Sequence, residues 1–137
     1  TDIIAGFPGE TEGDHKKTVD ALKEIEFDGI FAFKYSVRPG TLASGMKDQL
    51  NEQIKSERLA EILDLQDTIT LKINSKINDT VQEVLVEGPS ETDKSMLTGR
   101  TRTHKVVNFK GDSSLAGNII NLRIKEVRKH SLTGVIL

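Results

Sequence analysis

The first 36 residues most limit how this chain can fold, because a strand, a helix and a second strand follow one another there. An apolar run at 2–5 leads through a turn rich in glycine and proline into a helix that we expect to end near Glu26. The alternating run 30–36 predicts the second strand. Two strands joined by a helix pair in parallel with a right-handed crossover. A parallel sheet is covered on both faces, so we expect its remaining strands to lie upstream.

The second half of the chain has a different period. Apolar residues recur at helical spacing from 51 to 76, which predicts one long helix. Beyond Asp79 the period is two, and strand candidates follow at 80–87, 97–103, 105–110, 118–128 and 132–137. Short strands at this spacing favour a small antiparallel five-stranded barrel, which has no free edges. The predicted fold class is α/β plus all-β: the end of an α/β unit at 1–50, a linking helix at 51–77 and a β-barrel at 78–137.

Charge is unevenly distributed along a chain whose net charge is −2. Residues 95–130 hold eight Lys or Arg and two acidic residues, whereas the remainder holds 11 basic and 19 acidic residues. A basic segment on an otherwise acidic chain is typical of a part that meets a polyanion, and a solvated basic face without a partner is the alternative.

Several classes of site are excluded by composition and motif. The chain has no cysteine, so it can hold neither a disulfide nor a zinc ion or iron–sulfur cluster bound through thiolates. The histidines are dispersed, which argues against a metal site, and no phosphate-binding loop or nucleophile elbow is present. No apolar run approaches the roughly 20 residues of a membrane span, and no signal-peptide pattern opens the chain. We therefore expect a cytoplasmic protein without a membrane partner.

The segment 97–109 offers side chains suited to nucleic acid. Residues that alternate along a strand share a face, so we expect Arg100 and Arg102 to stand side by side with Thr98. Guanidinium forks can grip successive phosphates, and Thr, His and Asn can hydrogen-bond to sugars or base edges. The predicted contacts are Thr98, Arg100, Arg102, His104, Lys105 and Asn108. The alternative is a charged barrel face in solvent.

A second candidate site lies at the loop Gly6-Phe-Pro-Gly-Glu10, where a parallel strand ends and a helix begins. Folds of this class place ligands at such strand ends. The glycines let a ligand approach the backbone, and Glu10 can accept hydrogen bonds from an amine or a ribose. The segment 38–41 ends the next strand, so both loops should line one rim. A tight turn with a purely structural role is the alternative, and no complete active site is recognisable.

Five stretches, taken together and in order, resemble the C-terminal part of a MiaB-type radical-SAM tRNA methylthiotransferase. They are 2–11 (DIIAGFPGET), 35–41 (YSVRPGT), 55–59 (KSERL), 86–90 (VEGPS) and 97–109 (LTGRTRTHKVVNF). The resemblance covers essentially the whole chain. It implies the last two βα units of a partial (β/α) barrel, a linking helix and a C-terminal TRAM barrel that binds tRNA.

In that family a methylthio group is added to C2 of a prenylated adenosine beside the anticodon, using S-adenosylmethionine and two 4Fe–4S clusters. One cluster is held by a C-x-x-x-C-x-x-C motif, which this chain lacks. The resemblance therefore implies part of a longer enzyme, inactive alone, whose partners are the anticodon stem-loop of tRNA and a missing N-terminal catalytic part.

The resemblance also implies roles for particular residues. The pocket for S-adenosylmethionine and substrate would be flanked by Gly6, Pro8, Gly9, Glu10, Tyr35 and Arg38. The six residues predicted above to contact nucleic acid would contact tRNA, although position 104 is more often Asn in the family than His. Two alternatives stay open: a stand-alone RNA-binding barrel, and a sister methylthiotransferase that modifies a ribosomal protein. The stretches 86–90 and 97–109 favour the methylthiotransferases that modify tRNA over those that modify a ribosomal protein.

Overall fold

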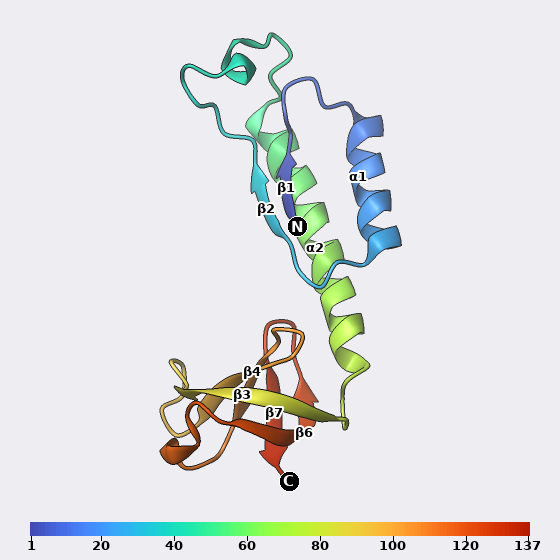
Figure 1. Cartoon of the computed structure of the whole chain (residues 1–137). Coiled ribbons are helices and arrows are strands. Elements are labelled where there is room, and N and C mark those ends of the chain that lie inside the picture. Colours follow the sequence, from blue (N-terminus) through green and yellow to red (C-terminus); the bar gives the residue numbers. More distant parts are fainter. The chain divides into compact units, whose positions relative to one another are not determined.

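The computed structural model describes residues 1–137, which form two compact units, Thr1–Thr70 and Leu71–Leu137 (Figure 1). The elements, in chain order, are β1 (Asp2–Ala5), α1 (Glu12–Ile25), β2 (Phe31–Lys34), the 3₁₀ turn η1 (Leu42–Gly45), α2 (Glu52–Ser75), β3 (Val81–Pro89), β4 (Leu97–Thr101), β5 (Val106–Phe109), the 3₁₀ turn η2 (Ser113–Leu115), β6 (Ile119–Val127) and β7 (Leu132–Ile136). The predicted combination of an α/β unit, a long helix and a five-stranded barrel is confirmed.

The first unit contains the predicted strand–helix–strand unit. Strands β1 and β2 pair in parallel, from Asp2 opposite Phe31 to Ala5 opposite Lys34. Between them α1 begins with a capping box, in which the Thr11 side chain accepts from the Asp14 backbone and the Asp14 side chain accepts from the Thr11 backbone. The helix start is thus set by local sequence.

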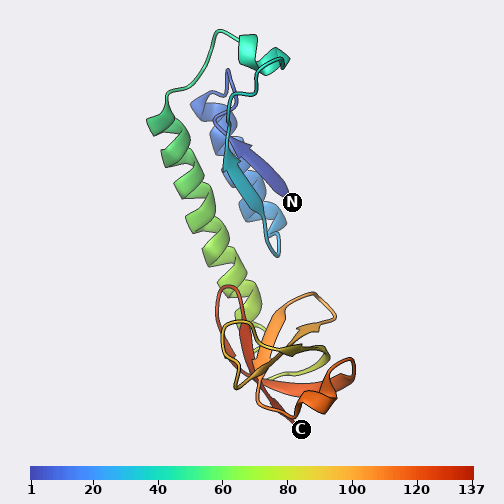
Figure 2. The same ribbon diagram turned by 90° about the vertical axis from the view of Figure 1, so that its left-hand side faces the viewer.

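One face of this small sheet is apolar and exposed. Ile4, Phe31 and Phe33 are solvent-accessible, and Ile4 lies directly opposite Phe33 in the parallel register. The alternate residue Ala5 is buried on the other face of the sheet. Helix α1 lies beside the two strands (Figure 2). Parallel sheets normally have both faces covered, so this face has the composition of one that packs against further structure.

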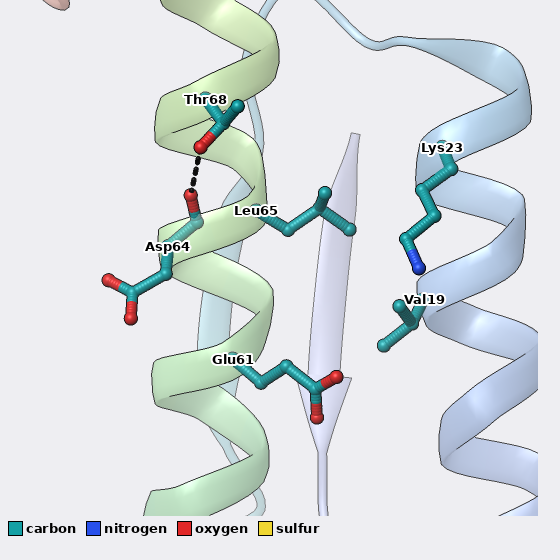
Figure 3. A pocket seen from close by; sticks show the side chains of 6 residues that line it. All are labelled: Val19, Lys23, Glu61, Asp64, Leu65 and Thr68. Atoms are coloured by element: carbon teal, nitrogen blue, oxygen red, sulfur yellow. Dashed lines mark hydrogen bonds between the residues drawn. The ribbon is translucent and has the colours of Figure 1, made fainter.

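Helices α1 and α2 pack together through apolar and polar contacts. Leu22 and Ile62 are fully buried, and His15 Nε2 lies 2.8 Å from Glu61 Oε2. A pocket of about 460 Å³ opens between the two helices (Figure 3). Its lining comprises Val19, Lys23, Glu61, Asp64, Leu65 and Thr68. None of these is a predicted site residue.

The second unit contains a closed barrel with strand order β3-β4-β5-β7-β6. The sequence predicts antiparallel pairing throughout, and four of the five pairs have it. The exception is β5 with β7, which is parallel. The reason is geometric: strand direction cannot alternate all the way round a ring with an odd number of strands, so at least one neighbouring pair must be parallel.

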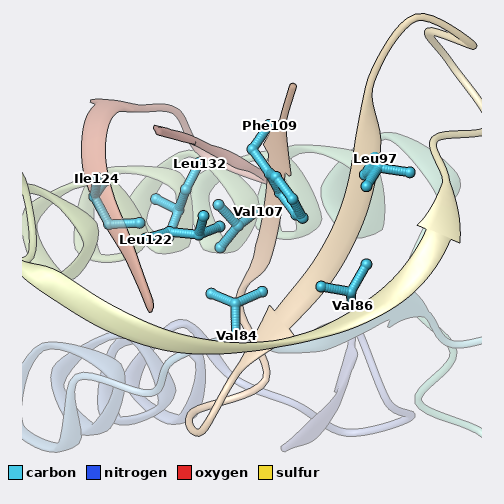
Figure 4. Close-up of a cluster of buried hydrophobic side chains, with 8 residues drawn as sticks. All are labelled: Val84, Val86, Leu97, Val107, Phe109, Leu122, Ile124 and Leu132. Atoms are coloured by element: carbon cyan, nitrogen blue, oxygen red, sulfur yellow. The ribbon is translucent and has the colours of Figure 1, made fainter. Parts of the chain in front are cut away.

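The barrel encloses a core of eight apolar side chains (Figure 4). They are Val84, Val86, Leu97, Val107, Phe109, Leu122, Ile124 and Leu132. Phe109 is completely buried, so the one aromatic ring of the barrel belongs to its core and is not available for stacking on a base. Gly99 is required by packing, because a Cβ atom there would lie 2.4 Å from the carbonyl oxygen of Leu85.

Candidate nucleic-acid interface

Strands β4 and β5 form a hairpin that carries all six residues predicted to contact nucleic acid. Its turn is closed by a hydrogen bond from the Thr101 amide to the Lys105 carbonyl, 3.0 Å long. His104 adopts a left-handed backbone with φ of 62°, and its amide donates to the Thr101 carbonyl. Strand β4 ends at Thr101, so Arg102 lies in the turn and not on the strand face where the alternation placed it.

The outer face of the hairpin carries three of the predicted residues. Thr98 lies directly opposite Asn108, and Arg100 lies opposite Val106. The neighbours on β4, Leu97, Gly99 and Thr101, are buried, which means that Thr98 and Arg100 lie on the outer face of the barrel. Arg102, His104 and Lys105 occupy the turn at the end of this face. The hairpin thus brings hydrogen-bonding and cationic side chains together on one side of the barrel.

Both arginines are held by glutamates of β3. Arg100 Nε donates to Glu87 Oε1 over 2.9 Å, and Arg102 Nε donates to Glu83. The hydrogen bond and charge of Arg102 lower the pKa of Glu83, and the hydrogen bond and charge of Glu83 in turn raise the pKa of Arg102. Sequence reasoning missed these carboxylates, although the period of two in 80–87 already places 83, 85 and 87 on one face.

Other basic residues of the barrel are also paired. Lys125 Nζ lies 2.8 Å from Asp79 Oδ1, and Arg128 pairs with Glu126. The unit Leu71–Leu137 nevertheless has 11 basic and seven acidic residues, whereas Thr1–Thr70 has eight basic and 14 acidic residues. The barrel unit therefore has a net positive charge of 4 and the first unit a net negative charge of 6, which makes the barrel the part suited to a polyanion.

The loop after β1 is tied to α2 through Glu10. Its Oε2 accepts from the Gly6 amide at 3.0 Å, and its Oε1 accepts from Arg58 Nη1 at 2.7 Å. The same Nη1 also donates to the Glu10 carbonyl. Gly6 has φ of 74°, and a Cβ there would lie 2.5 Å from the Cγ of Lys55. The carboxylate predicted to face a ligand thus holds its own loop in place.

Tyr35 and Arg38 lie in a different setting from Gly6 and Glu10. They line a pocket of about 470 Å³ that also includes Lys55 and residues of β2. The Tyr35 ring packs edge-on against Phe7 with 5.3 Å between centroids, and Lys55 Nζ lies 5.5 Å from its centre. The Tyr35 hydroxyl is buried and has no hydrogen-bond partner. It is a polar group that a ligand could satisfy.

Two residues that sequence reasoning gave no role, Lys55 and Arg58, hold these loops. Both are buried, and both lie in the stretch 55–59. Pro8 is buried too, and the Gly9 amide donates to the Asp48 carbonyl at 2.8 Å. The predicted ligand loop is therefore held by contacts with the start of α2 and with the backbone just before it.

No group of three His, Cys, Asp or Glu side chains is arranged to hold a metal ion. The chain has no cysteine, so its residues do not fit an iron–sulfur cluster. None of its helices is both long enough and apolar enough to cross a membrane.

The barrel and its hairpin define the class of module present. Residues 78–137 match the TRAM domain family. The whole chain is 49% identical to the tRNA-2-methylthio-N(6)-dimethylallyladenosine synthase of Alkaliphilus oremlandii and covers 29% of that protein. It is 49% and 44% identical to the synthases of the same name from Acetivibrio thermocellus and Carboxydothermus hydrogenoformans, covering 28% and 31% of them.

All three of these alignments include 137 residues, which is 100% of this chain. The chain is thus similar along its whole length to these synthases and spans about 30% of the length of the curated relatives it matches.

Proposed function

We propose that this chain supplies the tRNA-binding barrel and one wall of the substrate pocket of a methylthiotransferase. The reaction would add a methylthio group to C2 of a prenylated adenosine next to the anticodon, in the cytoplasm. The observation that carries the proposal is 44–49% identity, across both units, to synthases named for this product. These names favour tRNA over a ribosomal protein as the substrate.

The barrel's part is to hold the anticodon stem-loop. The outer face of the β4–β5 hairpin offers Thr98, Arg100 and Asn108, and its turn offers Arg102, His104 and Lys105. Guanidinium and ammonium groups bind phosphates, whereas the hydroxyl, amide and imidazole groups suit sugars and base edges. The positive charge of this unit favours the approach of any RNA.

The first unit's part is to shape the pocket. Tyr35 and Arg38 would line the site for S-adenosylmethionine, where the unpartnered Tyr35 hydroxyl and the adjoining pocket fit a polar ligand. S-adenosylmethionine would supply the methyl group. Gly6, Pro8, Gly9 and Glu10 would form the rim through backbone and shape, with the Glu10 carboxylate engaged by Arg58.

The two 4Fe–4S clusters do not fit this chain, because it has no cysteine to bind them. The cysteines that bind the clusters would come from the part of the full-length protein that corresponds to the unmatched part of the relatives, about 70% of their length. The 137 residues alone should therefore bind RNA without modifying it.

The proposal is tested by mass spectrometry of tRNA nucleosides from cells with and without the gene that encodes the full-length protein. The methylthio mark on prenylated adenosine should disappear without the gene, while the prenyl group stays. Persistence of the mark in the deletion strain would contradict the catalytic assignment. A gene carrying Arg100→Ala and Arg102→Ala should restore the mark less well than the wild-type gene at equal protein level.

A binding measurement tests the barrel's part directly. The 137-residue chain should bind an anticodon stem-loop, and its log K should fall by about 0.7–0.9 per phosphate contact with each tenfold rise in salt. Binding that is weak and does not change with salt would mean that the basic residues do not contact RNA and only form a solvated face of the barrel. Binding without any methylthio phenotype of the gene would favour a stand-alone RNA-binding module.

A further inference from the structure

Two exposed aliphatic side chains meet on the outer face of the barrel. Leu85 of β3 lies directly opposite Ile119 of β6, and their exposed fractions are 47% and 66%. On the other side of β3, Leu85 lies directly opposite Arg100 of β4. The next outward positions of β3 on either side, Glu83 and Glu87, are both acidic. The pair is therefore an apolar island inside a charged surface.

The island is the floor of a pocket of about 160 Å³. Its lining comprises Glu83, Leu85, Arg100, Thr101, Arg102 and Ile119. Arg100 is held by Glu87 and Arg102 by Glu83, so the polar wall presents guanidinium donors and carboxylate acceptors together.

We propose that this pocket binds one unstacked nucleobase of a single-stranded RNA loop, an inference that rests on the RNA-binding function proposed above. A bare phosphate suits the site poorly, because the carboxylate of Glu83 repels it and Leu85 and Ile119 cannot hydrogen-bond to it. A base suits both parts: its flat face covers the aliphatic floor, and its edge offers donors and acceptors to the paired charges. The guanidinium groups can still reach the phosphates on either side of that base.

Leu85 and Ile119 also take the place of the aromatic side chains that many single-strand binders have. Such proteins usually stack bases on aromatic side chains, but the only aromatic ring of this barrel, Phe109, is fully buried. Leu85 and Ile119 are the two aliphatic residues that line this pocket. They can cover the base with aliphatic contact and thereby remove apolar area from water.

The test compares two RNA hairpins that share a stem, one with a normal loop and one whose loop nucleotides are all abasic. The phosphates are the same, so only base contacts differ. The double variant Leu85→Thr, Ile119→Thr should bind the normal loop about five- to tenfold more weakly, as expected if roughly 40–50 Å² of apolar contact is lost. Its affinity for the abasic loop and its salt dependence should equal those of the wild type.

Val135→Thr is the matched control, since Val135 is also an exposed aliphatic residue of the barrel and lies outside the pocket. It should bind both RNAs like the wild type. An equal loss of the double variant on both hairpins, or no loss on the normal loop, would overturn the base site. The first result would point to altered folding, and the second to a surface that meets the rest of the protein.

A scan with wild-type protein tests the inference without any substitution. Each loop nucleotide is made abasic in turn, and one position should account for most of the lost affinity. Equal small losses at every position would overturn a single base pocket. If the wild type binds neither hairpin, the RNA-binding function itself fails, and this outcome is distinct from tight binding that ignores the bases.

Discussion

The carboxylate of Glu10 and the guanidinium of Arg58 meet at 2.7 Å across 48 residues of sequence, with only 14% and 9% of their side chains exposed. The pair ties the loop after β1 to α2. Because the same carboxylate accepts from the Gly6 amide, the loop conformation depends on this contact. The pair therefore supports the rim of the proposed pocket.

Arg58→Ala should destabilise the first unit, because it leaves Glu10 charged and largely buried without its cation. Breaking a buried pair costs about 3–5 kcal/mol, and the remaining bond from the Gly6 amide should place this variant at the low end of that range. The measurement is hydrogen exchange at residues 6–10 together with thermal unfolding. Lys17→Ala is the control, since its 3.4 Å pair with Asp14 is exposed and should change stability little. Equal effects of the two substitutions would contradict the structural role of Arg58.

Gly99→Ala should destabilise the barrel, because the added Cβ meets the Leu85 carbonyl at 2.4 Å and a Val84 methyl at 2.6 Å. A backbone atom cannot turn away as a flexible side chain can, so strands β3 and β4 must separate. We expect a loss of about 1–3 kcal/mol, as for other overpacked sites. Gly45→Ala, whose Cβ would meet nothing within 4 Å, is the control. The measurement is urea unfolding, and a Gly99→Ala midpoint equal to that of the wild type would contradict the close approach.

Elements set by local sequence could be predicted. The capping box of Thr11 and Asp14 marks the start of α1, and the period of two beyond Asp79 marks the barrel strands. The parallel pair β5–β7 could not be read in this way, because it depends on how the ring closes and not on any local pattern.

Only the cationic residues of the candidate site could be predicted from the sequence. The cationic residues of the hairpin are visible as a run in the sequence, but their carboxylate partners lie on a different strand. The register of β3 against β4 decides that Glu83 and Glu87 reach the two arginines. Arg58 likewise meets Glu10 only through tertiary packing, although it lies in one of the stretches that carry the family resemblance.

Glu83→Gln with Glu87→Gln should strengthen RNA binding, because both carboxylates compete with phosphates for Arg100 and Arg102. These pairs are exposed and therefore weak, so we expect a gain of roughly two- to tenfold at low salt. The control for net charge also removes two carboxylates that are paired elsewhere on the barrel: Glu126→Gln, whose partner is Arg128, with Asp79→Asn, whose partner is Lys125. A gain no larger than that of the control would show that the pairs do not restrain the arginines.

Arg100→Ala with Arg102→Ala should act in the opposite direction. Two lost phosphate contacts should flatten the plot of log K against log salt by about 1.4–1.8. The measurement is a salt titration of binding to the anticodon stem-loop. Weaker binding with an unchanged slope would assign the two guanidinium groups to base edges, and unchanged binding would assign them to a solvated face.

Asp79 should make the barrel unit sensitive to acid. The hydrogen bond and charge of Lys125 hold the pKa of Asp79 below its ordinary value of 3.8. The unfolded chain therefore binds this proton at a higher pH than the folded chain, so the stabilisation is present above about pH 3.8 and is lost as pH falls through the folded pKa. Asp79→Asn keeps a residue that tolerates the left-handed backbone at this position, φ of 59°, but lacks the charge. The difference in Tm between wild type and variant should shrink from pH 5 to pH 2.5, and a constant difference would contradict the assignment.

The two units should differ in stability. Strands β1 and β2 form a two-stranded sheet whose Ile4, Phe31 and Phe33 face solvent, and isolated two-stranded sheets are marginal in water. The barrel has no free edges, and Val107 and Phe109 of β5 are fully buried. We therefore expect amides of 2–5 and 31–34 to exchange with solvent faster than those of 106–109 in the same 137-residue chain. Full-length protein should show slower exchange at 2–5 and 31–34 if further structure covers the exposed apolar face. Equal protection of both units in the 137-residue chain would mean that the small sheet needs no such cover.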